Sequence, residues 1–225
     1  MATSERTTDG TDSVAVIGLG RFGGQVAAAL ERLGHEVLAI DSDAALVQKW
    51  ADRLTHVVEA DATDEDALRQ LGVADLPRAV VGIGTDIEAS ALTVISLSGL
   101  GVPEIWAKAI TAKHGQILER IGAHHVVYPE AAMGERVAHL VTGKMIDFIE
   151  FDDGYAIVKT RAPHEAAGRT LGESALRSKY GVTVVGVKRP GQDFTYARPE
   201  TMVTRGDLLI VSGATKEVER FAAVT

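Results

Sequence analysis

The sequence predicts an α/β fold in which a parallel-sheet domain precedes a small α+β module. Short apolar runs alternate with amphipathic segments up to about residue 143, and the first run ends in a glycine-rich turn. Such alternation is typical of βαβ units and a parallel sheet. After Lys144 the pattern changes, because two apolar runs are joined by Asp152-Asp153-Gly154. A tight turn of this kind predicts an antiparallel hairpin.

The first domain is predicted over residues 13–143. Its strands are expected at 13–17, 36–40, 56–59, 79–83, 104–107 and 125–128, and its helices at 22–33, 44–53, 65–71, 87–99, 113–121 and 131–142. The last of these helices has an apolar face, which either packs on its own sheet or forms a crossover or dimer helix. That face consists of Met133, Val137, Leu140 and Val141.

The second module is predicted over residues 144–225. Its strands are expected at 145–151, 155–161, 182–188 and 208–212, with helices at 173–180 and 216–222. Residues 1–12 are rich in Thr, Ser, Asp and Glu and lack the apolar segment of a secretory signal. We therefore expect a disordered tail there.

Composition narrows the class of protein. The chain has 225 residues, 46% hydrophobic and 24% charged, which is typical of a globular protein of one or two domains. Its net charge of -8 argues against a nucleic-acid binder. The absence of cysteine excludes disulfides, thiolate metal sites and cysteine nucleophiles, and it fits a reducing compartment. No apolar run approaches the roughly 18 residues of a membrane span, so any membrane role would need a partner.

The glycine-rich turn has the pattern Gly18-x-Gly20-x-x-Gly23. Gly18 permits a tight turn, Gly20 lets the backbone approach a phosphate, and Gly23 lets the following helix pack closely. The free N–H groups of that helix then face an anion. Asp41 ends the next apolar run, where a carboxylate accepts hydrogen bonds from ribose hydroxyls and disfavours the 2′-phosphate of NADP. Together they predict a Rossmann-like nucleotide site.

Arg21 lies inside this turn, where a guanidinium can pair with phosphate oxygens. It favours a nucleotide with a longer phosphate chain, although an exposed helix arginine is the alternative. Asp61 ends the third run, and it either contacts an adenine edge or caps the helix that begins near Thr63. No P-loop is present, since Gly143-Lys144 is followed by Met145. The remaining expected nucleotide contacts are Phe22, Ser42, Ala62 and Gly84.

These motifs resemble the regulatory subunits of Ktr/Trk-type bacterial potassium uptake systems, of the KtrA kind. Such subunits have an RCK (KTN) nucleotide-binding domain and a small C-terminal RCK module. The match extends over nearly all of the chain after the tail. It is carried by residues 18–24 (GLGRFGG), 34–41 (GHEVLAID), 60–63 (ADAT), 105–108 (IWAK), 118–123 (LERIGA), 128–130 (YPE), 133–134 (MG) and 179–181 (KYG).

The resemblance implies a cytoplasmic subunit that is not an enzyme. It implies homodimers that assemble into an octameric ring on the inner face of the membrane, beneath a potassium channel or transporter subunit. ATP in the Rossmann pocket favours the conducting state, and ADP favours the closed state. Arg21 would read the terminal phosphate, Asp41 would hold the ribose, and Lys108 and Glu130 would lie near the phosphates.

Two further ligands are expected. Glu130 beside a triphosphate would be repelled unless a cation mediates, and carboxylate and phosphate oxygens suit Mg²⁺ or Ca²⁺; alternatively, Glu130 only satisfies N–H groups at a helix start. In some relatives of the second module, cyclic di-AMP binds at a dimer interface, and a plain dimerisation module is the alternative. The matching positions are Leu176, Arg177, Thr183 and Pro199.

Three other classes of function compete with this interpretation. An NAD-dependent oxidoreductase needs a substrate domain with a proton-transfer group, but the second module is small and the seven histidines form no catalytic pattern. A regulatory module that senses NAD or NADH could use the same pocket. A DNA-binding redox sensor is disfavoured by the acidic charge and by the lack of a helix-turn-helix signature.

Overall fold

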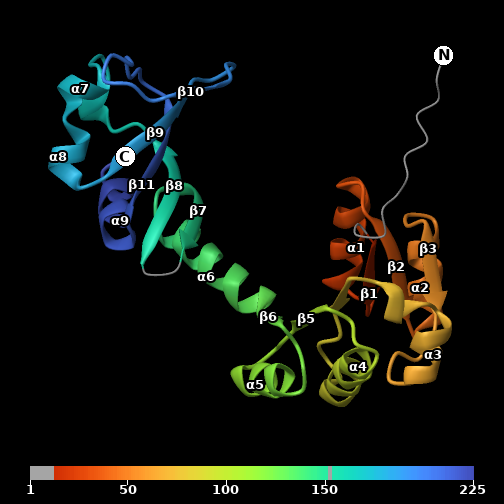
Figure 1. The fold of residues 1–225 in the computed structure, drawn as a ribbon. Coiled ribbons are helices and arrows are strands. Elements are labelled where there is room, and N and C mark those ends of the chain that lie inside the picture. Colours follow the sequence, from red (N-terminus) through yellow and green to blue (C-terminus); the bar gives the residue numbers. More distant parts are fainter. Residues whose placement is uncertain (1–12, 152–153) are drawn as a thin grey trace, which may run out of the picture. The chain divides into compact units, whose positions relative to one another are not determined.

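The computed structural model describes residues 13–151 and 154–225, which form two compact units that divide after Glu130. The predicted fold class is confirmed, because a six-stranded parallel sheet is followed by a five-stranded antiparallel sheet. The expected tail, and Asp152 and Asp153 of the expected turn, lie outside the described residues. Figure 1 labels the elements of both units, which are described separately below.

The first unit alternates strands and helices as the sequence predicts. Its six strands form one sheet in the order β3-β2-β1-β4-β5-β6, and every pair of neighbouring strands is parallel. The order reverses beside β1, which is where open α/β sheets bind ligands. Its elements are β1 (Ser13–Ile17), α1 (Gly23–Arg32), β2 (Glu36–Asp41), α2 (Ala44–Ala51), β3 (His56–Glu59), α3 (Glu65–Gln70), the 3-10 helix η2 (Val73–Asp75), β4 (Arg78–Val81), α4 (Ile87–Gly99), β5 (Glu104–Lys108), α5 (Ala112–Arg120) and β6 (His125–Val127).

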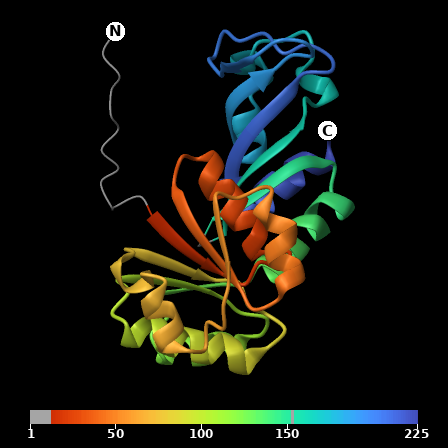
Figure 2. The ribbon, with the colours of Figure 1, turned by 90° about the vertical axis from the view of Figure 1, so that its right-hand side faces the viewer.

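Helices cover this sheet from both sides (Figure 2). On one face, Leu68 of α3, Leu97 of α4 and Leu118 of α5 join the buried side chains of β1, β4 and β5 in one core. On the other face, Ala27 of α1 and Trp50 of α2 cover β1 and β2. The sheet is therefore buried on both faces at β1, and the carboxyl ends of its central strands are held in a rigid frame.

Polar residues fix the starts of the helices that follow the strands. Asp43, Asp64, Asp86 and Thr111 are the N-caps of α2, α3, α4 and α5, and each side chain accepts a backbone N–H from the first turn. Such caps satisfy donors that a helix start otherwise leaves unpaired. The loops at the carboxyl ends of β2, β3 and β4 are consequently well defined.

Helix α6 (Pro129–Thr142) continues from the first unit into the second. The sequence predicts its start at residue 131, but the helix begins at Pro129, because a proline ring is preset for the first helical position. Glu130 consequently lies in the first turn. The sequence-based boundary, at 143, lies at the opposite end of this helix from the division in the structure.

The second unit packs helices on an antiparallel sheet of order β10-β9-β11-β8-β7. Its core gathers Phe148, Leu176, Tyr180 and Phe221. Its elements are β7 (Met145–Phe151), β8 (Tyr155–Arg161), the 3-10 helix η3 (His164–Ala166), α7 (Leu171–Ser174), α8 (Leu176–Tyr180), β9 (Thr183–Lys188), β10 (Phe194–Tyr196), β11 (Leu208–Ala214) and α9 (Thr215–Ala223).

One prediction for this unit was wrong, and one strand was missed. The single helix expected at 173–180 is divided into α7 and α8, because Ala175 between them adopts a left-handed backbone with φ 49°. Ala175 is the only non-glycine residue with positive φ among those that the structure describes. The edge strand β10 was not predicted, since it has only three residues within a polar segment.

Candidate functional site

A cavity of about 270 Å³ lies at the carboxyl ends of β1, β2, β3 and β4. Its position matches the reversal in strand order at β1, where a ligand is expected. Several predicted residues line it, and they are Gly18, Gly20, Asp41, Ser42, Asp61, Ala62 and Gly84. Four loops that are distant in sequence therefore contribute to one site.

The fold requires glycine at some positions of the β1–α1 turn but not at others. Gly18 has φ +87°, and a Cβ atom on Gly23 would lie 1.9 Å from the carbonyl oxygen of Gly18. Both positions therefore require glycine for the fold itself. A Cβ atom on Gly20 would meet no atom within 4 Å. The protein's own packing does not require glycine there, which fits the expected close approach of a phosphate.

Asp41 holds the glycine-rich turn in place. Its Oδ2 accepts the backbone N–H of Leu19 at 2.5 Å, and its Oδ1 accepts that of Asp43 at 2.8 Å. The indole Nε1 of Trp50 donates to the carbonyl oxygen of Leu19 at 2.8 Å. Asp41 therefore has a structural role in addition to the ribose contact that the sequence predicts.

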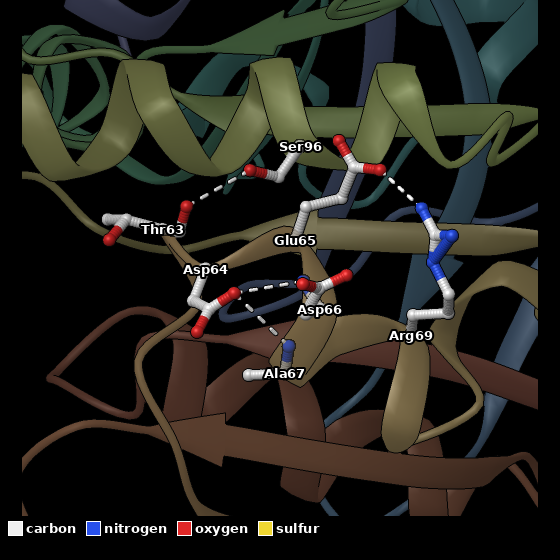
Figure 3. A network of polar contacts seen from close by, with 7 residues as sticks. All are labelled: Thr63, Asp64, Glu65, Asp66, Ala67, Arg69 and Ser96. Atoms are coloured by element: carbon white, nitrogen blue, oxygen red, sulfur yellow. Dashed lines mark hydrogen bonds and ion pairs between the residues drawn. The ribbon is translucent and has the colours of Figure 1, made fainter.

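Asp61 does not cap a helix. Its Oδ1 accepts the hydroxyl of Thr63 at 2.7 Å and the backbone N–H of Thr63 at 2.9 Å. These bonds, the hydroxyl first, hold the pKa of Asp61 below its ordinary value. Figure 3 shows that the cap of α3 is Asp64, which accepts the backbone N–H groups of Asp66 and Ala67. The alternative that Asp61 is a cap is therefore wrong, and its carboxylate lines the cavity.

The loop after β3 is tied to α4. The hydroxyl of Ser96 donates to the carbonyl oxygen of Thr63 at 3.2 Å (Figure 3). In the same network Arg69 pairs with Glu65 along α3. The exposed pair adds little stability, but the Ser96 bond fixes the wall of the cavity that carries Asp61.

A charged group lies beside the cavity at Gly84. The Nζ of Lys108, at the end of β5, lies 2.6 Å from Oε1 of Glu130, and a Cβ atom on Gly84 would lie 3.1 Å from that Nζ. The same Nζ lies 5.8 Å from the centroid of the Phe22 ring, within cation–π range. Only 11% of the Lys108 side chain is exposed, compared with 65% for Glu130.

Glu130 is stabilised as a carboxylate. The hydrogen bond from Lys108 is the main cause that holds the pKa of Glu130 below its ordinary value. The backbone N–H at the start of α6 and the charge of Arg21 act in the same direction. The structure therefore brings Arg21, Phe22, Lys108 and Glu130 together beside the cavity, although none of them lines it.

Sequence reasoning missed the part of the cavity formed by the loop after β4 and by α4. Thr85, Asp86, Ala89 and Thr93 belong to this wall. The hydroxyl of Thr93 is buried and has no hydrogen-bond partner among the described residues. Such a group is available to a ligand. This wall could have been predicted from the sequence Gly82-Ile83-Gly84-Thr85-Asp86, in which two glycines come shortly before a residue that caps a helix.

A second hollow, of about 250 Å³, lies in the second unit. It is lined by all four positions matched to cyclic di-AMP binding, namely Leu176, Arg177, Thr183 and Pro199. Arg198 also lines it and was not predicted. The turn at Ala175 ends α7 and starts α8, which carries Leu176 and Arg177.

The fold and the first cavity define a nucleotide-binding protein of the Rossmann type with an appended α+β module. The sequence matches the family model of the TrkA-N domain over residues 14–129 and that of the TrkA-C domain over residues 155–224. The chain belongs to the TrkA-N/TrkA-C family of potassium uptake proteins. None of the helices in the described ranges is both long enough and apolar enough to cross a bilayer.

Two curated relatives have almost the same length as this chain. Ktr system potassium uptake protein A of Bacillus subtilis (strain 168) is 38% identical over 208 residues, which cover 92% of this chain and 94% of the relative. The protein of the same name from Vibrio alginolyticus is 34% identical over 205 residues, or 91% and 93% of the two chains.

Solved structures share the fold. The GsuK RCK domain has a TM-score of 0.66 at 21% identity, covering 96% of this chain and 48% of that chain. The GsuK channel bound to NAD has a TM-score of 0.64 at 21% identity, covering 93% and 38%. The present chain therefore spans less than half the length of either structure.

Proposed function

We propose that the protein is the nucleotide-controlled regulatory subunit of a membrane potassium uptake system, and that its role is regulatory rather than catalytic. The observation that carries the proposal is the cavity at the sheet's switch point, with Gly20 open to it and Asp41 in its lining. The relatives from Bacillus subtilis and Vibrio alginolyticus support the assignment to potassium uptake.

ATP and ADP are the proposed ligands, with NAD or NADH as the alternative. Arg21 and Lys108 place two cationic side chains next to the glycine-rich turn. Guanidinium and ammonium groups stabilise a phosphate chain, and the first turn of α1 contains no acidic residue that would repel it. GsuK has been solved both with NAD and with ADP, so a related fold accepts either kind of nucleotide.

A divalent cation is proposed between Glu130 and the phosphates. Without a ligand, Lys108 neutralises the Glu130 carboxylate at 2.6 Å. A phosphate chain beside Lys108 would compete for its ammonium group and leave Glu130 facing negative oxygens. Mg²⁺ or Ca²⁺ suits such a set of carboxylate and phosphate oxygens, and Glu130 would supply one ligand while Arg21 compensates charge nearby.

The proposed mechanism is a shift between two shapes of the assembled subunit. A nucleotide moves such an equilibrium only by binding one shape more tightly than the other. ATP and ADP differ in the γ-phosphate, and Arg21, with Glu130 through a cation, is the group in a position to read it. ATP then favours the conducting state of the system and ADP the closed state.

Family membership and an exposed face of α6 support a proposal for the partners. We propose homodimers that form an octameric ring on the cytoplasmic face of a membrane-embedded potassium channel or transporter subunit. The apolar face predicted on α6 is only partly packed, because Met133, Val137 and Val141 are exposed, whereas Leu140 contacts the core of the second unit. An exposed apolar stripe on a helix supports an interface with a second copy.

Calorimetric titration with ATP, ADP and NADH, each with and without Mg²⁺, tests the nucleotide assignment. We expect tight binding of ATP and ADP and weaker binding of NADH. Mg²⁺ should tighten ATP binding in the native protein and have little effect in Glu130→Gln, because the amide is a weaker ligand for a hard cation.

The matched control is Glu119→Gln, which removes an exposed carboxylate of α5 that does not line the cavity. It should retain the Mg²⁺ effect. Tight NADH binding with weak ATP binding would contradict the assignment, and equal ATP affinity with and without Mg²⁺ in both the native protein and Glu130→Gln would contradict the cation.

The hollow of the second unit is proposed to bind cyclic di-AMP. It contains two arginines, Arg177 and Arg198, and the apolar side chains of Leu176 and Pro199. This combination suits a ligand that has both phosphates and flat bases. We expect Arg177→Ala to weaken cyclic di-AMP binding by about 10-fold or more, as for loss of a charge-assisted hydrogen bond.

Calorimetry of the dimeric protein measures that binding. Arg205→Ala, on an exposed turn outside the lining of the hollow, should bind as the native protein does. The same affinity in Arg177→Ala and the native protein would leave the hollow without a role in binding, and the module would then serve dimerisation alone.

A further inference from the structure

Three side chains with metal-binding atoms meet in the second unit. Glu135 and His139 lie one turn apart on α6, and Glu150 lies on β7. One ligand atom from each lies within 4.8 Å of the other two. Ligand atoms with bonds of about 2.0–2.2 Å to a tetrahedral ion lie about 3.3–3.6 Å apart, so these side chains would move closer by up to about 1.5 Å on binding. Residues four apart on a helix share a face, so the backbone already directs Glu135 and His139 to the same place.

The imidazole of His139 is held in a fixed orientation. Its Nδ1 lies 3.0 Å from Oε1 of Glu219 on α9, and its ring stacks on Phe148 at 4.1 Å between centroids and 21° between planes. A nitrogen bonded to a carboxylate carries the proton in neutral imidazole, which leaves Nε2 with its lone pair. A carboxylate behind a histidine is the arrangement that orients metal-binding histidines in proteins.

The two carboxylates are also available for a cation. Glu150 Oε1 accepts the hydroxyl of Thr215 at 2.7 Å, which orients the group without neutralising it. The side chain of Glu135 has no hydrogen bond or ion pair in the described part of the chain. The adjacent guanidinium of Arg136 is paired with Asp147 at 2.5 Å. The cluster therefore brings together two carboxylates that form no ion pair with a described side chain, although Arg136 lines the same hollow.

The cluster opens to a hollow of about 240 Å³, in whose lining Glu135, Phe148 and Glu150 take part. An ion has access from this side. His139 does not line the hollow, and 22% of its side chain is exposed. Three protein ligands on an open hollow leave positions for water in the coordination sphere.

We propose that Glu135, His139 and Glu150 bind a divalent transition-metal ion, with Zn²⁺ as the representative ion and Glu219 as the residue that positions His139. The imidazole nitrogen distinguishes this site from one for Mg²⁺ or Ca²⁺, which take oxygen ligands. The ion would tie α6 to β7 and, through Glu219, to α9. The proposal does not depend on the nucleotide site.

Zn²⁺ titration by calorimetry tests the site, using the full-length protein without tag, metal or nucleotide. The Glu130→Gln background removes the carboxylate proposed for the nucleotide-linked cation. We expect one Zn²⁺ per chain that millimolar Mg²⁺ does not displace. His139→Gln and Glu150→Gln should each weaken binding by at least about 10-fold, and Glu219→Gln by about 10- to 100-fold with unchanged stoichiometry.

His164→Gln, on an exposed segment of the same unit, is the matched control and should bind Zn²⁺ normally. Visible absorption of the Co²⁺ form should change in Glu219→Gln, because the orientation of the imidazole changes. Circular dichroism checks that each variant is folded. If His139→Gln does not fold, Glu150→Gln tests the site, because glutamine has nearly the same shape as glutamate. Absence of Zn²⁺ binding, or equal binding in the native protein, His139→Gln and Glu150→Gln, would overturn the proposal.

Discussion

Gly23→Ala is expected to destabilise the nucleotide domain by about 3 kcal/mol, the upper end of the usual cost of overpacking. The added Cβ atom would lie 1.9 Å from the carbonyl oxygen of Gly18. That oxygen belongs to backbone and cannot rotate away, since Gly18 is fixed by its positive φ and by its N–H, which donates to the carbonyl oxygen of Ile40 at 2.8 Å. Helix α1 would have to move away from the sheet.

Urea unfolding measures this change, and Gly20→Ala is the matched control in the same turn. Its Cβ atom meets nothing within 4 Å, so the stability should remain within about 1 kcal/mol of the native protein. Its nucleotide affinity should fall nevertheless, because a methyl group would lie where a phosphate approaches. Equal stability of Gly23→Ala and Gly20→Ala would contradict the packing argument, and native affinity in Gly20→Ala would contradict the phosphate position.

Arg21→Ala is expected to reduce the ratio of ATP to ADP affinity by about 10-fold or more. Hydrogen bonds from a charged group to phosphate contribute about 1.5–3 kcal/mol, and only the interaction with the γ-phosphate distinguishes the two ligands. Arg21 is exposed and its charge acts on Glu130. Its loss should therefore leave the fold intact while the discrimination declines.

Calorimetry with both nucleotides measures the ratio, and circular dichroism checks the fold. Arg32→Ala is the control, because it removes a guanidinium from the last turn of α1, the helix that follows Arg21. If Arg21→Ala retains the native ratio, Arg21 does not sense the terminal phosphate, and Lys108 becomes the remaining candidate.

Most of the first unit could be predicted from sequence because its signals are local. Each strand is a short apolar run between helices, and Gly18, Gly20 and Gly23 mark the turn at the first of them. The contribution of the loop after β4 to the cavity was missed because the predicted strand was too long. Strand β4 ends at Val81, two residues earlier than predicted, so the residues after it belong to the loop.

Contacts between residues that are distant in sequence could not be predicted from local sequence patterns. The bond between Lys108 and Glu130, 22 residues apart, depends on the adjacent position of β5 and β6 and on the helix that starts at Pro129. Asp61 and Asp64 are both plausible caps by residue type, and only the backbone geometry selects Asp64. In the second unit, the left-handed conformation of Ala175 has no residue-type signal, since alanine favours a continuous helix.

The bonds of Asp41 have a thermodynamic consequence. Because its carboxylate already holds Leu19 and Asp43, the glycine-rich turn is ordered before any ligand arrives, and little binding free energy is spent on freezing it. Asp41 thus raises the affinity of the site by reducing the conformational entropy that the turn loses when a nucleotide binds. Loss of these two bonds to the turn would weaken ATP and ADP alike, because the bonds order the empty turn and do not touch the phosphate chain. Loss of a contact with the γ-phosphate would weaken ATP alone.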